Sequence, residues 1–179
     1  SIEGMNWVDP EGRILVSNLP QGAGRNISPG KHFQEVQAGQ SWAVGDLMER
    51  GAILDNPIAA VAVAVRDRDG RLIGVVAAGI DPTRLGELTF AHQRHAGGAY
   101  AIFDGQGQLV YRNPPVPLTW QDRLRWQQHD LLLRQALEGR AAQGVFTSPM
   151  IGDRCVGARV PISGTTWVAG AASPLNAAM

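Results

Sequence analysis

The sequence of 179 residues lacks the features that define several functional classes. Its single cysteine excludes an internal disulfide and any metal site built from several cysteines. Sixteen basic residues balance sixteen acidic residues without forming a basic run, so we expect no nucleic acid as a partner. No apolar run approaches the roughly eighteen residues of a membrane-spanning helix, and no targeting segment is recognisable.

Signatures of catalysis are also missing. The serines lack the G-x-S-x-G setting of a hydrolase nucleophile, and no evident base accompanies them. No glycine cluster has the spacing of a phosphate-binding loop. His92 and His95 are spaced like metal ligands on a helix, but no carboxylate or cysteine stands at a supporting position. We therefore expect no catalytic residue, no metal and no cofactor in this chain.

Residues 58–81 form the centre of the apolar pattern. Two apolar runs flank the polar segment 66–70, which predicts a β-hairpin whose turn uses the backbone freedom of Gly70. Valine and alanine alternate in the first run, so one face of the strand is bulky and the other is shallow; the shallow face carries Ala60, Ala62 and Ala64. Such a face leaves room for closely packed helices or for a small ligand, and the pattern does not decide between them.

The turn pattern D-x-x-G-x followed by two apolar residues, found early in the chain, returns in its second half. Asp9 and Gly12 have their counterparts in Asp104 and Gly107. The two patterns predict hairpins over 5–18 and 101–111. Their separation is too long for a repeat array, so it indicates two related modules.

The remaining segments complete an α+β plan. A helix with Ser28 as N-cap and Pro29 at its first position is expected to end by Gly39, with a strand over 41–47. A longer helix, opened by a Thr119–Asp122 capping box, is expected over 119–138, and three strands follow at 144–148, 155–162 and 165–172. Each module is thus a mostly antiparallel sheet flanked by helices. The expected domains are residues 1–84, a connector at 85–98, and residues 99–179.

This order of segments resembles the double Cache family, also called PDC, the extracytoplasmic PAS-like sensor modules of bacterial membrane receptors. The resemblance rests on D-P-E-G-R-I-L-V-S-N at 9–18, on G-x-N-I-S followed by His32 and Phe33, and on the run from Val65 to Asp81. The second hairpin and the strands up to Ala172 resemble the membrane-proximal module. The resemblance implies that the first module is membrane-distal and binds a small solute.

Two departures from the family pattern affect what it implies. The family begins with a long helix rising from the first transmembrane segment, whereas here strand-like sequence begins near Met5. We interpret the chain as a piece of a longer protein in which this helix was either trimmed or is absent. The amino-acid-binding version of the family carries a tyrosine, an arginine and a tryptophan-tyrosine pair, and no such cluster appears between His32 and Pro57. The resemblance therefore implies no amino-acid ligand.

Each candidate ligand contact also has a purely structural interpretation. In the family's amine and amino-acid binders the aspartate at the position of Asp81 can reach the ligand ammonium, but an aspartate before proline at a helix start also serves as an N-cap. His32, Phe33 and Trp42 are expected to cover the shallow face and to wall a pocket; alternatively Phe33 and Trp42 are core and His32 is solvated. Ala60, Ala62 and Ala64 are the expected floor.

The sequence thus predicts the extracytoplasmic, non-catalytic sensor domain of a membrane receptor, with a sensor histidine kinase as the favoured full-length protein. Chemoreceptors and cyclic-dinucleotide enzymes are alternative outputs. The expected partners are a small solute and a membrane reached through segments outside this chain, with a homodimer left open. A dimerisation or protein-interaction module without a small ligand is the alternative from another class, and an enclosed cavity would favour sensing.

Overall fold

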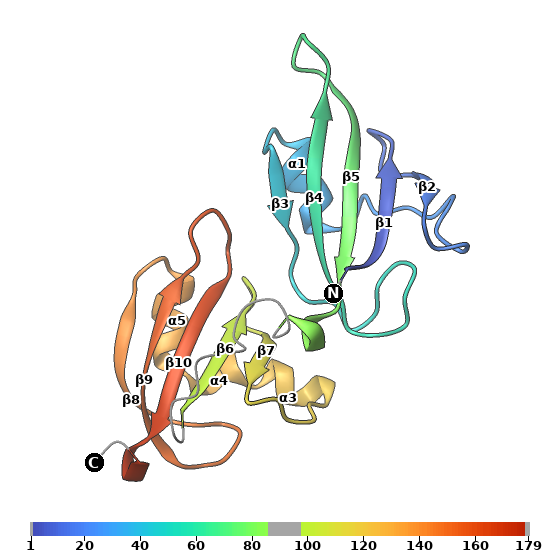
Figure 1. The fold of residues 1–179 in the computed structure, drawn as a ribbon. Helices are drawn as coiled ribbons and strands as arrows, with labels where there is room; N and C mark the ends of the chain where they lie inside the picture. The colour runs from blue at the N-terminus through green and yellow to red at the C-terminus, as the bar shows by residue number, and fades with distance from the viewer. Residues whose placement is uncertain (1, 86–97, 178–179) are drawn as a thin grey trace. The chain divides into compact units, whose positions relative to one another are not determined.

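The computed structural model describes residues 2–85 and 98–177. These residues form two compact units, Ser1–Pro82 and Thr83–Met179, hereafter the first and the second unit. Each unit contains one antiparallel sheet of five strands with its helices packed beside it (Figure 1). The α+β class predicted from the sequence is confirmed. Most of the expected connector, including His92 and His95, lies outside the described residues.

The sheet of the first unit has the strand order β2-β1-β5-β4-β3. Its elements are β1 (Ile2–Val8), β2 (Ile14–Ser17), α1 (Lys31–Gln37), β3 (Trp42–Val44), β4 (Ala59–Arg66), β5 (Leu72–Ile80) and the 3-10 helix η1 (Pro82–Arg84).

The second unit repeats this plan, with the strand order β7-β6-β10-β9-β8. Its elements are β6 (Ala99–Phe103), β7 (Leu109–Asn113), α3 (Trp120–Leu124), α4 (Trp126–His129), α5 (Leu131–Leu137), β8 (Ala142–Thr147), β9 (Arg154–Pro161), β10 (Val168–Pro174) and the 3-10 helix η2 (Leu175–Ala177). In both units the first hairpin therefore lies beside the last strand of the same unit.

Two expected helices differ from the structure. The N-cap of α1 is Gly30 rather than Ser28, because the amide of Gly30 donates to the carbonyl of Ile27 and closes a turn before the helix begins. The expected long helix over 119–138 is divided into α3, α4 and α5. Asp130 has an extended backbone, ends α4, and accepts the amide of Leu133 to cap α5. The Thr119–Asp122 capping box is present as expected.

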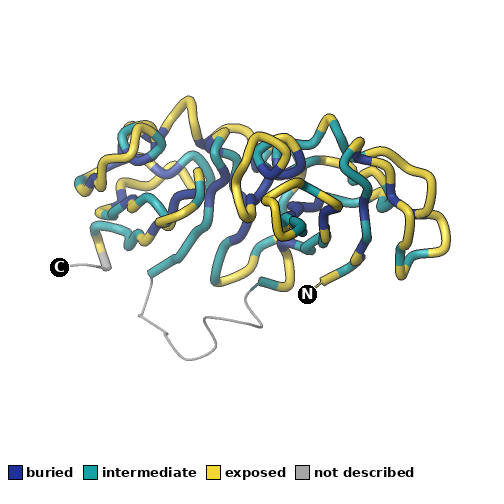
Figure 2. Tube along the Cα trace, turned by 90° about the horizontal axis from the view of Figure 1, so that it is seen from above, coloured by how far each residue is buried: buried dark blue, intermediate teal, exposed yellow. Residues whose placement is uncertain are grey.

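The strand register shows which residues face the helix. Ala60, Ala62 and Ala64 point to the side on which α1 packs, and Val63 on the opposite side is 46% exposed. Pairing aligns an outward row of apolar residues across the whole sheet: Val16, Trp7, Val76, Val63 and Trp42. Figure 2 shows that buried stretches lie in the strands and helices, whereas exposed residues gather at the loops. The alanine face is therefore the inner face.

The three D-x-x-G turns have one geometry. Asp9, Asp67 and Asp104 each accept the backbone amides two and four residues further on, with N···O distances of 2.7–3.1 Å. The glycine three residues after each aspartate has a positive φ, which favours glycine. Asp104 differs from the other two because it is completely buried.

We expect Asp104→Ala to lower the free energy of unfolding of the second unit by about 2–3 kcal/mol, because two amides of a buried turn lose their acceptor. Urea denaturation measures this loss. Asp104→Asn is the matched control, since its Oδ1 still accepts and most of the stability should be kept. Equal losses in both variants would contradict this account of the turn.

Candidate functional site

A cavity of about 290 Å³ lies on the inner face of the first unit. Its floor includes three residues paired side by side on adjacent strands: Gly4 of β1, Gly79 of β5 and Ala60 of β4. Two of the three have no side chain and the third has only a methyl group, so the sheet is shallow at this row. A Cβ added at Gly79 would lie 2.5 Å from Cδ1 of Ile58, which shows how closely the cavity wall approaches the floor.

The rows next to this floor are covered by α1. Phe33 and Val36 are completely buried and form a core cluster with Val8, Val75 and Ala62. The shallow face is thus only partly covered by helix. Helix α1 packs on one end of the face, and the cavity lies over the other end.

The walls of the cavity come from two loops and from the start of α1. The loop after β2 contributes Leu19, Asn26, Ile27, Pro29 and Gly30, and the loop before β4 contributes Met48 and residues 51–54. The lining side chains are mostly apolar, and the three polar ones are Asn6, Asn26 and His32. Apolar walls with a few placed polar groups are typical of small-molecule sites.

The imidazole of His32 packs against Gly30 and Gly45, where the lack of a side chain leaves room for the ring. A Cβ at Gly30 would lie 2.4 Å from Cε1 of the imidazole, and a Cβ at Gly45 would lie 3.0 Å from its Nδ1. The ring is 5% exposed, and burial lowers the pKa of His32 from 6.5 to about 4. The imidazole is therefore neutral at neutral pH. The neighbouring Lys31 forms an ion pair with Asp46 at 3.3 Å.

The low pKa of His32 predicts that the first unit loses stability in mild acid. In the unfolded chain His32 has a pKa near 6.5, whereas in the folded chain its pKa is about 4. Between these pH values only the unfolded state binds the proton, so the free energy of unfolding falls as the pH is lowered from 6.5 to 4. We expect the free energy of unfolding to be about 2 kcal/mol lower at pH 5 than at pH 7.5, as measured by urea denaturation.

Two variants separate this effect from other titrations. His32→Gln should flatten the pH dependence, and His129→Gln, at an exposed position in the second unit, should leave it unchanged. The same slope in the wild type and in both variants would contradict the assignment to His32.

The structure brings together two of the residues proposed as ligand contacts. His32 and Ala60 both line the cavity, whereas Phe33, Trp42, Ala62, Ala64 and Asp81 are not among the lining residues. Phe33 and Ala62 belong to the core, and Ala64 packs against it. Trp42 is 43% exposed on the outward face, paired with Val63. Asp81 is half-buried and directly precedes η1.

Sequence reasoning missed Asn6 and the loop before β4. Asn6 is the polar exception on the inner face of β1, between Gly4 and Val8. Strict alternation along the strand would have identified it as a polar residue facing the core. The loop residues carry no such signal, because their packing over the floor depends on tertiary structure.

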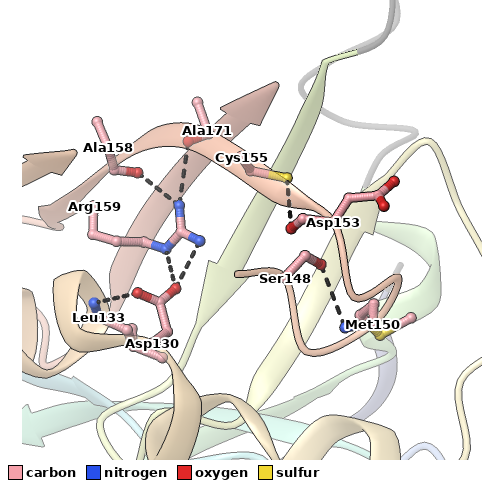
Figure 3. A network of polar contacts seen from close by, with 9 residues as sticks. All are labelled: Asp130, Leu133, Ser148, Met150, Asp153, Cys155, Ala158, Arg159 and Ala171. Carbon is pink, nitrogen blue, oxygen red and sulfur yellow. Dashed lines mark hydrogen bonds and ion pairs between the residues drawn. The ribbon is translucent and has the colours of Figure 1, made fainter. Parts of the chain in front are cut away.

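The inner face of the second unit carries a buried polar network (Figure 3). Register places Arg159 of β9 in the row that Ala62 occupies in the first unit, and its side chain is 2% exposed. Its guanidinium forms a 2.7 Å ion pair with the buried Asp130 and donates to the carbonyls of Ala158 and Ala171. The rings of Phe103 and Phe146 lie 5.4 and 4.6 Å from its Cζ. The network lies in the row of Ala101, Gly170 and Arg159, next to the row of Ala99, Ala172 and Gly157 that corresponds to Gly4, Gly79 and Ala60.

Two other hollows lie on the second unit. One, of about 660 Å³, is lined by small residues near the ends of the strands, such as Gly98, Ala99 and Gly157. The other, of about 270 Å³, lies on the outward sheet face between Tyr100, Tyr111 and Val160. Neither is lined by an asparagine or a histidine. Among the described residues, no group of three or more His, Cys, Asp or Glu is placed to hold a metal ion.

Comparison with known families identifies the chain. The family model of the Cache domain matches residues 2–179. The chain belongs to the Cache domain family. The resemblance proposed from the sequence is thus confirmed. No curated protein matches the Cache chain.

Solved structures of sensor domains have the same fold as this Cache chain. The extracellular domain of rpHK1S-Z16, a protein named as a histidine kinase, has 15% identity and a TM-score of 0.72, covering 99% of this chain and 72% of that one. The ligand-binding domain of the Pseudomonas fluorescens chemoreceptor CtaA in complex with L-isoleucine has 14% identity and a TM-score of 0.69, with coverages of 98% and 70%. The sensor domain of the Vibrio cholerae histidine kinase DctB has 16% identity and a TM-score of 0.61, with coverages of 96% and 72%. The neighbours are thus extracytoplasmic sensor domains. Within residues 2–85 and 98–177 of this Cache chain, no helix has the length and apolar character needed to cross a bilayer.

Proposed function

We propose that this Cache chain is the extracytoplasmic, ligand-sensing part of a bacterial transmembrane receptor and binds a small solute in the cavity of the first unit. A sensor histidine kinase is the favoured full-length protein, because histidine kinases are among the structural neighbours. Chemoreceptors are the alternative, since they occur among the neighbours as well. Attachment to the membrane through segments outside this chain and assembly as a homodimer belong to the same proposal.

The observation that carries the proposal is the make-up of the cavity in the first unit. The inner face is open over Gly4, Gly79 and Ala60, and the buried polar side chains of Asn6 and His32 line this opening. Such a cavity is the default position for a ligand.

A ligand held there would contact three parts of the first unit at once. The sheet floor, the loop at 26–30 and the loop at 51–54 all line the cavity. A solute that binds one arrangement of these loops more tightly than another shifts the population toward the tighter-binding arrangement. The free energy of this shift cannot exceed the difference between the two binding free energies. The shifted population is the signal that a receptor can transmit.

The proposal is tested by filling the cavity. Ala60→Leu places a larger side chain on the floor, and Val63→Leu, on the opposite face of the same strand, is the matched control. In a thermal-shift screen of metabolites, a solute that raises the melting temperature of the wild type and of Val63→Leu should have no effect on Ala60→Leu. A screen without any stabilising solute, or equal responses from both variants, would count against a sensing function.

A second function is favoured by the outward row of the first sheet. Val16, Trp7, Val76, Val63 and Trp42 align across all five strands, and four of them are more than a third exposed. Such a row favours a dimerisation or protein-interaction module. Light scattering measures the molar mass of the wild type and of Val63→Glu. A lower mass for Val63→Glu would indicate self-association through this row, and equal masses would contradict it.

A further inference from the structure

We infer that the cavity of the first unit selects an uncharged, largely apolar small molecule that carries a hydrogen-bond donor, and that it rejects free amino acids and carboxylates. The inference rests on the proposed sensing function and specifies its ligand class. It is drawn from the lining residues of the cavity, from the burial of Asn6 and from the state of His32.

The first argument is the lack of charge in the lining. None of the described residues that line the cavity is Asp, Glu, Lys or Arg. The nearest charged side chain in sequence to His32, Lys31, is not among them and is engaged with Asp46. An ammonium or carboxylate group that left water for this cavity would find no opposite charge, and burying an unpaired charge is strongly unfavourable.

The second argument is the buried amide of Asn6. Its side chain is 8% exposed and lines the cavity, and its Oδ1 accepts no hydrogen bond from any residue that the structure describes. Buried acceptors without a partner are rare in proteins because each costs free energy. A hydroxyl or N–H group of a ligand over the Gly4–Gly79–Ala60 floor would satisfy this oxygen.

The third argument is the neutral imidazole of His32. Burial keeps its pKa at about 4, so at neutral pH it offers no positive charge to a carboxylate. A neutral imidazole offers one donor nitrogen and one acceptor nitrogen. Asn26, the other polar lining residue, already accepts the amide of Ser28 through its Oδ1 at 2.7 Å. The cavity thus offers polar contacts without any net charge.

An amino acid would require a different cavity. Its ammonium group needs a carboxylate and its carboxylate needs a cation or several donors. Asp81, the carboxylate that the family resemblance assigned to an ammonium, is not among the lining residues. The ligands in the titles of several structural neighbours, such as L-isoleucine and L-leucine, are therefore not expected to bind here.

The test uses three matched sets of probes and isothermal titration calorimetry. Each set holds a neutral donor, its methylated form and the amino acid with the same apolar part. The sets are indole, 1-methylindole and L-tryptophan; phenol, anisole and L-tyrosine; and 3-methylbutan-1-ol, 1-methoxy-3-methylbutane and L-leucine. We expect at least one neutral donor to bind, its methylated form to bind roughly tenfold more weakly, and the matching amino acid not to bind.

Asn6→Leu tests the contact itself, because leucine has a similar size and no polar group. In this variant the affinity for the donor should fall and the tenfold preference over its methylated form should disappear. Asn18→Leu, which changes an asparagine outside the cavity lining, is the control and should keep the preference. A preference that persists in Asn6→Leu would overturn the assigned contact.

Failure of this inference is distinguishable from failure of the sensing function. If an amino acid or carboxylate binds the wild type better than every neutral probe, and Ala60→Leu abolishes that binding, the inference is wrong and the sensing function stands. If no neutral compound from the sets or from the metabolite screen binds, the inference is also wrong. If no solute of any kind binds, both proposals fall.

Discussion

Asp130→Ala is expected to lower the free energy of unfolding of the second unit by about 3–5 kcal/mol, the largest loss that the structure predicts for an ion pair. The variant leaves the guanidinium of Arg159 buried without its counter-charge. Asp130 also caps α5 through the amide of Leu133 at 3.0 Å, so the helix loses its N-cap in the same step. Both losses come from one carboxylate that is completely buried.

Hydrogen exchange read by mass spectrometry measures this loss in each unit separately. Amides of β9, β10 and α5 should exchange faster in Asp130→Ala, and amides of the first unit should not change. Glu138→Ala, which removes the exposed partner of Arg140, is the control and should cost less than about 1 kcal/mol.

A double variant tests whether the loss comes from the unpaired charge. Asp130→Leu combined with Arg159→Met removes both charges and should be more stable than Asp130→Ala, because no buried ion is left alone. A double variant as unstable as Asp130→Ala would instead assign the loss to packing and capping.

Phe33→Ala is expected to lower the free energy of unfolding of the first unit by about 3–5 kcal/mol. The phenyl ring is completely buried and packs on the inner sheet face with Val36, Val75 and Ala62. Its removal would leave a cavity at the contact between α1 and the sheet. The expected loss follows from this burial, although the sequence pattern had placed Phe33 at the wall of a pocket.

The comparison with Trp42 separates a core residue from an exposed one. Trp42→Ala should cost less than about 1 kcal/mol, because its side chain lies on the outward face and is 43% exposed. Phe33→Leu should recover most of the stability and leave solute binding unchanged. Loss of binding in Phe33→Leu, with stability kept, would show that the ring contacts the ligand after all.

Much of the fold was predictable because its signals are local. The alternation of valine and alanine over 59–65 and the D-x-x-G turns each depend on a few adjacent residues. The division of the helix at Asp130 was not predictable from helical periodicity. The carboxylate of Asp130 pairs with the buried Arg159, which belongs to β9, and the backbone of Asp130 is extended at this point.

The cavity was less predictable than the fold, because its floor is made by pairing between distant strands. Gly4 and Gly79 are unremarkable in their own segments, and they form a shallow row only once β1 pairs with β5. The alanines of β4 indicated the correct face, but which end of that face stays open depends on where α1 ends and where the two loops pack. Of the predicted ligand contacts, His32 and Ala60 line the cavity because one lies at the start of α1 and the other at the start of β4.

The strand order also determines when the cavity of the first unit can form during folding. β1 precedes the other strands of the first unit, but its neighbour β5 is the last strand of that unit, whereas β4 and β5 are joined by a short turn. Pairing between strands that are distant in sequence is slow to form. We therefore expect the β4–β5 hairpin to assemble early and β1 to join late. The row of Gly4, Gly79 and Ala60 is completed only at that late step, so the proposed binding site cannot form in a nascent or partly folded unit.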